Sequence, residues 1–109
     1  MMKELFVLQA DICKTMANPI RMEIIYALKE GEKGVGELVE ITGLTKSNVS
    51  QHLSVLKSAT MVLARRDGKN IFYSIANKKI LEACRLMREV LIEHLNDNQK
   101  LIDKLQNTK

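Results

Sequence analysis

A run of short polar side chains in residues 42–56 has the composition of a binding surface. The residues in it that we expect to contact a partner are Thr45, Lys46, Ser47, Asn48, Ser50, Gln51 and His52. Amides and hydroxyls can hydrogen-bond to base edges, while lysines and hydroxyls bind phosphates. A solvated helix usually carries many Glu and Lys residues, and no carboxylate occurs between residues 42 and 56. This composition favours a flat anionic partner such as a DNA groove; the alternative is a polar-faced helix without a partner.

The same run has the spacing of a helix. Thr45 is a good N-cap, and Val49, Leu53 and Leu56 then recur at steps of four and three residues. The polar residues fall on the opposite face. Because a short helix is expected just before it, with a tight turn at Gly43, we interpret the segment as the recognition helix of a helix-turn-helix.

Enzyme chemistry has little support in this sequence. No serine or cysteine has a histidine at a spacing typical of a nucleophile and its base, and there is no glycine-rich phosphate loop. Glu89, Glu93 and Asp97 form a row beside His94, but such a row is more typical of a solvated helix face than of a metal site. We therefore expect no catalytic activity, no cofactor and no metal ion.

The two cysteines, Cys13 and Cys84, leave two interpretations open. Since no export signal precedes them, we expect reduced thiols in the cytoplasm. Cys84 and His94 are separated by about 15 Å along one helix and cannot share an ion, and two thiolates are too few for a closed zinc site. The cysteines are either small core residues or a thiol sensor that meets at a dimer interface and reacts with oxidants.

Charge and composition predict one DNA-binding domain over residues 1–109. The net charge is +4, and residues 44–79 carry seven basic side chains against one acidic side chain. A basic field confined to one segment is typical of a protein with a polyanionic partner. Aromatic residues make up only 4% of the chain, so stacking on unpaired bases is a poor explanation, and double-stranded DNA is the expected partner. No segment has the length and hydrophobicity of a membrane span.

Periodicity and turn signals predict the remaining elements. Helices are expected over residues 3–16, 19–30 and 35–41, with Asn18 and Pro19 starting the second. Strands are expected over residues 61–66 and 71–75, around a turn at residues 67–70. Arg65, Arg66 and Lys69 lie at or near that turn, which predicts a basic wing whose Arg66 and Lys69 contact DNA. A hairpin that only packs would not need three cations at one end.

A final helix is expected over residues 77–106. An apolar stripe runs along it, formed by Ile80, Cys84, Met87, Leu91, Leu95, Ile102 and Leu105. Such a helix would be about 45 Å long, more than a small domain can cover, so its stripe predicts a twofold dimer. The alternative is that the helix folds back over its own domain. The expected fold class is mainly α with one β-hairpin, a winged helix-turn-helix.

Four segments in this order resemble the ArsR/SmtB family of small winged helix-turn-helix repressors. They are residues 16–21 (MANPIR), 35–38 (VGEL), 47–53 (SNVSQHL) and 66–73 (RDGKNIFY), within a resemblance that spans about residues 5–95. The resemblance implies a dimer built on the first and last helices that represses promoters until an inducer releases it from DNA. It leaves the inducer unknown.

The metal sites of that family do not transfer to this sequence. Residues 38–40 (LVE) replace the cysteine pair at the start of the third helix, and the aligned ligand positions on the last helix hold Asn77, Lys79, Val90 and Glu93. A second departure is Thr60, where relatives usually have Gly. A β-branched residue loses about 1 kcal/mol in the left-handed conformation expected there.

The sequence thus predicts a homodimeric repressor of an inverted-repeat operator. Gln51 and Asn48 are the expected base contacts, and Ser47, Ser50 and His52 are expected to support them or to bind phosphates. The alternative is a degenerate winged helix that binds a protein; its equivalent face should then be acidic or apolar.

Overall fold

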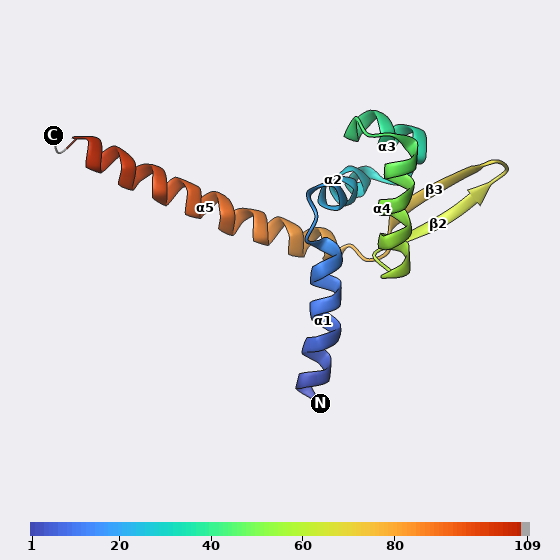
Figure 1. The fold of residues 1–109 in the computed structure, drawn as a ribbon, viewed down its shortest axis with the longest axis horizontal. Helices are drawn as coiled ribbons and strands as arrows, with labels where there is room; N and C mark the ends of the chain where they lie inside the picture. Colours follow the sequence, from blue (N-terminus) through green and yellow to red (C-terminus); the bar gives the residue numbers. More distant parts are fainter. Residues whose placement is uncertain (108–109) are drawn as a thin grey trace.

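The computed structural model describes residues 1–107 and has the predicted fold class, mainly helical with a small antiparallel sheet (Figure 1). Its elements are α1 (Met2–Met16), α2 (Pro19–Ala27), the 3-10 helix η1 (Leu28–Glu30), β1 (Lys33–Gly34), α3 (Val35–Thr42), α4 (Lys46–Ser58), β2 (Val62–Asp67), β3 (Asn70–Ile75) and α5 (Lys79–Asn107). The predicted second helix is therefore two elements, because its last turn tightens into η1 before Gly31.

Local capping explains where the first helices begin and end. The Asn18 side chain accepts hydrogen bonds from the backbone N–H groups of Ile20 and Arg21, at 2.9 and 3.1 Å, and Pro19 occupies the first helical position. Arg21 also donates through Nε to the Thr15 carbonyl at 2.6 Å. This hydrogen bond links the end of α1 to the start of α2.

The helix-turn-helix is formed by α3 and α4, as predicted. Gly43 ends α3 with a left-handed φ of 72°, and the Thr45 hydroxyl caps α4 by accepting from the Asn48 N–H at 3.2 Å. A second left-handed residue follows α4: Thr60 has a φ of 59°. The turn thus has the left-handed conformation expected at this position, despite the β-branched side chain.

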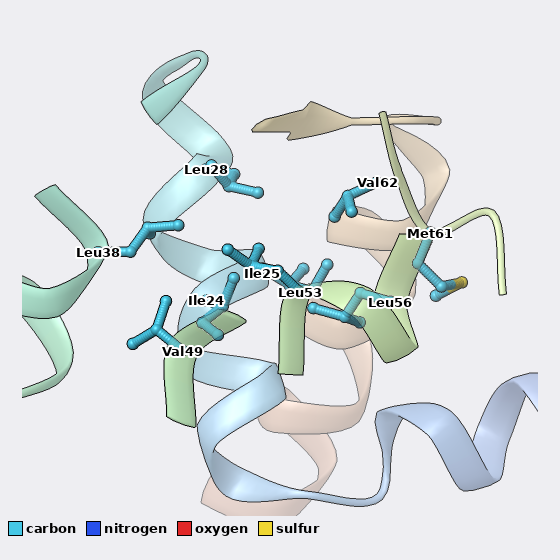
Figure 2. Close-up of a cluster of buried hydrophobic side chains, with 9 residues drawn as sticks. All are labelled: Ile24, Ile25, Leu28, Leu38, Val49, Leu53, Leu56, Met61 and Val62. Atoms are coloured by element: carbon cyan, nitrogen blue, oxygen red, sulfur yellow. The ribbon is translucent and has the colours of Figure 1, made fainter. Parts of the chain in front are cut away.

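The core lies between α2, α3, α4 and the base of β2 (Figure 2). Its buried side chains are Ile24, Ile25, Leu28, Leu38, Val49, Leu53, Leu56, Met61 and Val62. Three of them form the predicted apolar stripe of α4, so burial of this stripe fixes which face of α4 points outward.

The sheet has the strand order β1-β3-β2, and β1 was not predicted. Its two residues pair with β3, Lys33 with Tyr73 and Gly34 with Phe72. A strand this short has no readable alternation. The predicted four-residue turn of the hairpin is also wrong in detail, because Asp67 pairs with Asn70 and only residues 68 and 69 connect the strands.

The two terminal helices project from this body in different directions (Figure 1). Neither α1 nor α5 contains a fully buried residue, and the radius of gyration of 17.9 Å exceeds the value of about 13 Å expected for a compact chain of this length. Only Ile80, Leu81 and Cys84 of α5 pack against the core. The alternative in which the last helix folds back over its own domain is therefore wrong. Within residues 1–107, no helix is long and apolar enough to span a membrane.

Candidate nucleic-acid interface

The outward face of α4 consists of polar side chains. Thr45, Lys46, Ser47, Asn48 and Gln51 are exposed, and Ser50 and His52 are half-buried. The opposite side of the helix is fully buried. The structure thus exposes five of the seven predicted residues around the first turns of α4, and the other two, Ser50 and His52, are partly covered.

Hydrogen-bonding capacity on this face is largely unused. Thr45 accepts the capping bond from the Asn48 backbone, and it keeps its hydroxyl proton as a donor. In the described part of the chain, the side chains of Lys46, Asn48 and Gln51 have no hydrogen-bond or ion-pair partner. Amide groups that are exposed and unbonded can donate and accept in the pattern that a purine edge presents in the major groove.

The wing carries two free cations rather than three. Arg66 and Lys69 are exposed and have no acidic partner within residues 1–107. Arg65 is bound within the protein: its Nη2 and Nε donate to the two carboxylate oxygens of Glu32 at 2.6 and 3.1 Å. The guanidinium holds the pKa of Glu32 below its usual value. The ion pair with Glu32 gives Arg65 a role within the protein, and the two wing cations predicted to contact DNA, Arg66 and Lys69, remain without such a partner.

The cysteines lie in different environments and both are free thiols. Cys13 is exposed on α1, where it lines a shallow groove of about 450 Å³ with Phe6 and Lys14. Cys84 is half-buried against the core, and this burial raises the pKa of its thiol, although the charge of Arg88 acts in the opposite direction. The structure therefore exposes one thiol and shields the other.

Glu89, the first residue of the acidic row of α5, pairs with another side chain of the helix. Arg85 pairs with Glu82 at 2.5 Å and also with Glu89, while His94 shares a hydrogen bond with Asn98 at 3.2 Å. In residues 1–107, no three His, Cys, Asp or Glu side chains lie close enough together to hold a metal ion.

Asn77, one of the positions aligned with the family's metal ligands, caps the start of α5. The Asn77 side chain accepts a hydrogen bond from the Lys79 N–H at 2.9 Å, which is a typical cap at the beginning of a helix.

Two tertiary contacts were missed from the sequence. Glu32 bonds to Arg65 across 33 residues, and Arg88 of α5 lies over the ring of Tyr26 of α2. Local periodicity gives no signal for either pair, because each joins residues far apart in the chain.

Comparisons with known proteins agree with this architecture. Residues 18–62 match the family described as bacterial regulatory protein, arsR family. The uncharacterized HTH-type transcriptional regulator Rv0081 of Mycobacterium tuberculosis is 42% identical over 103 residues, which cover 94% of this chain and 90% of that protein. Its crystal structure superposes with a TM-score of 0.78 at 44% identity, covering 86% of this chain and 95% of that one.

Two further solved structures resemble this chain in both fold and sequence. The homodimeric winged helix-turn-helix DNA-binding domain Mb0332 of Mycobacterium bovis has a TM-score of 0.78 at 32% identity, with 88% of this chain and 89% of that chain covered. The transcriptional repressor BigR of Xylella fastidiosa has a TM-score of 0.74 at 31% identity, with 82% and 91% covered. The chain is therefore a winged helix-turn-helix protein that belongs to the arsR family of bacterial regulatory proteins, a family of DNA-binding transcriptional regulators.

Proposed function

We propose that the protein is a homodimeric repressor that binds an inverted repeat in double-stranded DNA in the cytoplasm. The observation that carries the proposal is the outward face of α4, on which Lys46, Asn48 and Gln51 are exposed and unbonded. A helix that keeps its amides free and carries no carboxylate on this face is suited to a major groove.

The dimer is supported by apolar surface on the two projecting helices. On α1, Leu5, Phe6, Leu8 and Ile12 are each at least 45% exposed, and on α5 nine large apolar side chains are exposed in the same way. Exposed apolar surface on this scale is typical of an interface. The similar Mb0332 domain is described as homodimeric, and BigR is described as a repressor.

Twofold symmetry determines the form of the operator. Two α4 helices would enter successive major grooves about 34–36 Å apart on one side of the duplex. We assign base contacts to Gln51 and Asn48, and phosphate or supporting contacts to Thr45, Lys46, Ser47, Ser50 and His52. Arg66 and Lys69 would bind phosphates or the minor groove beside each half-site.

A protein-interaction module is the second candidate, and it has less support. If α4 bound a protein partner, its outward face should be apolar or acidic. The outward face of α4 carries one exposed large apolar side chain, Val55, which is 41% exposed. The basic balance of residues 44–79 also favours DNA.

Regulation of the repressor by thiol chemistry is a separate proposal. An oxidant or thiol-reactive agent would modify Cys13 and Cys84, the only two cysteines of the chain. Neither of the two best-known metal sites of the family is proposed, because residues 38–40 contain no thiolate and Asn77 caps α5.

Selection of bound duplexes from a random pool tests the DNA proposal directly. We expect enrichment of an inverted repeat with half-sites one helical turn apart, bound by a dimer whose mass is measured by light scattering. Affinity for the selected duplex should fall steeply as salt rises. Absence of an enriched sequence, together with salt-independent binding, would favour the protein-interaction module.

A further inference from the structure

The sheet narrows from three strands to two along the wing. Gly34 pairs with Phe72, and Phe72 pairs with Arg65, so these residues form the outermost row of three strands. Beyond this row, Ile71 and Asn70 pair only with Arg66 and Asp67. A two-stranded ribbon is marginally stable in water by itself, so the part of the wing that carries Arg66 and Lys69 needs support from its base.

Arg65, which lies in that last row, contacts residues of both neighbouring segments. Its guanidinium carbon is 4.9 Å from the centroid of the Phe72 ring on the neighbouring strand. Two of its nitrogens bond to the carboxylate of Glu32, the residue just before β1. The side chain therefore links β2 to the segment before β1, across β3, at the position where the sheet narrows.

Its neighbour Arg66 points to the other side of the wing and has no such partners. Successive side chains of a strand point to opposite faces, so Arg65 and Arg66 point to different sides of the wing. Arg66 has no carboxylate or ring partner in the described chain. A phosphate can bind all of the Arg66 guanidinium without breaking any contact, whereas two of the three guanidinium nitrogens of Arg65 already donate to Glu32.

We propose that Arg65 is a positioning residue for DNA binding: held by Glu32 against Phe72, it braces the wing so that Arg66 and Lys69 reach the phosphates. Arg65 itself makes no DNA contact. This inference rests on the proposed function, since it assigns roles within the same interface.

The salt dependence of DNA affinity separates the two arginines. Each phosphate contact contributes about 0.9 to the log-log salt slope, so Arg66→Gln should make the slope of a dimer shallower by about 1.8. Arg65→Gln should weaken binding of the selected operator about tenfold, equivalent to about 1.4 kcal/mol, and leave the slope unchanged. Arg65→Lys, which keeps the charge but loses the bidentate geometry, should behave like Arg65→Gln.

A charge exchange provides the second readout. Glu32→Arg combined with Arg65→Glu restores an ion pair at unchanged net charge, and should bind operator more tightly than Arg65→Glu alone. Circular dichroism would establish that each variant is folded. A slope that becomes shallower by about 1.8 in Arg65→Gln would overturn the proposal, as would a double variant no better than Arg65→Glu. If wild-type protein shows no salt-dependent DNA binding, the proposed function itself fails, which is a different outcome.

Discussion

Arg88 of α5 lies over the ring of Tyr26 of α2, with its guanidinium carbon 5.2 Å from the ring centroid. Lys29 approaches the same ring at 4.7 Å. The Arg88 contact lies beyond the part of α5 that packs against the core, which ends at Cys84. It therefore helps to set the direction in which α5 leaves the body, and this direction determines how two DNA-binding bodies would be placed in a dimer.

Replacing Arg88 tests the strength of this contact. Arg88→Gln should lower the free energy of unfolding by about 0.5–1 kcal/mol, the usual contribution of a cation–π pair at an exposed site. Lys100→Gln, on an exposed part of the same helix, serves as the control and should change it by less than about 0.5 kcal/mol. Both are measured by urea denaturation at one protein concentration, because a dimer gains stability with concentration. Equal changes would show that the Tyr26 contact contributes nothing specific.

The turn after α4 offers a stabilising substitution. Thr60 has a φ of 59°, a region that costs a β-branched residue about 1 kcal/mol and that glycine adopts freely. Thr60→Gly should therefore raise the free energy of unfolding by up to about 1 kcal/mol. Ala59→Gly is the matched control: Ala59 has an ordinary φ of −84°, so added backbone freedom should destabilise the protein. A Thr60→Gly protein less stable than wild type would mean that the threonine side chain makes a favourable contact that outweighs the strain.

Local signals explain why most of the fold was predictable. Asn18 starts α2, Gly43 ends α3 and Thr45 caps α4, and each forms hydrogen bonds to residues within four positions. Pro19 favours the start of α2 through its fixed φ. The unpredicted strand β1 depends instead on pairing with Phe72 and Tyr73, almost forty residues later. Its two residues carry no periodicity that sequence reasoning can use.

The proposed DNA-binding surface likewise has a part that sequence spacing predicts and a part that depends on tertiary contacts. The positions of Asn48 and Gln51 follow from burial of the α4 stripe, which sequence spacing reveals. The wing was predicted as a hairpin with three cations at one end, of which Arg66 and Lys69 were expected to contact DNA, but no role was predicted for Arg65. Glu32 occupies Arg65 and leaves Arg66 free, and charge counting alone cannot distinguish two adjacent arginines.

Gln51 is the sharpest test of base recognition. Gln51→Ala should relax preference at one base pair in each half-site, at a cost of about 1–3 kcal/mol for that position. The measurement is competition binding with operators changed one base pair at a time. Gln106→Ala, an exposed glutamine at the end of α5, is the control and should leave the preference profile unchanged. An unaltered profile in the Gln51 variant would remove this residue from the base contacts.

Lys69 tests whether the tip of the wing touches DNA. Two wings in a dimer lose two phosphate contacts in Lys69→Ala, so the log-log salt slope should become shallower by about 1.8 while base preference stays the same. Lys104→Ala removes an exposed charge from α5, far along the chain from the wing, and should leave the slope nearly constant. Equal slopes for wild type and Lys69→Ala would mean that the tip does not contact the duplex.

The exposure of Cys13 and the raised pKa of Cys84 predict the order in which the two thiols react. Burial raises the pKa of Cys84, so less of its reactive thiolate is present near neutral pH. Cys13 is exposed in the single chain and should be alkylated first by iodoacetamide at pH 7.5 in protein diluted to the monomer. Raising the pH should accelerate labelling of Cys84, because its thiolate fraction increases as the pH approaches its raised pKa. Comparable labelling rates for both thiols at pH 7.5 in folded protein would contradict this order.

Serine variants of the two cysteines distinguish two forms of thiol regulation, a disulfide and the modification of one thiol. A disulfide between Cys13 and Cys84 requires Cα atoms within about 7 Å, either in one chain or across a dimer. If a two-electron oxidant such as diamide forms it, each cysteine supplies one thiol, and Cys13→Ser and Cys84→Ser should abolish DNA release equally. If modification of the exposed thiol alone weakens DNA binding, Cys13→Ser should abolish the release and Cys84→Ser should retain it. Wild-type release in both single variants would show that neither thiol is a sensor and that Cys84 serves only to pack α5 against the core.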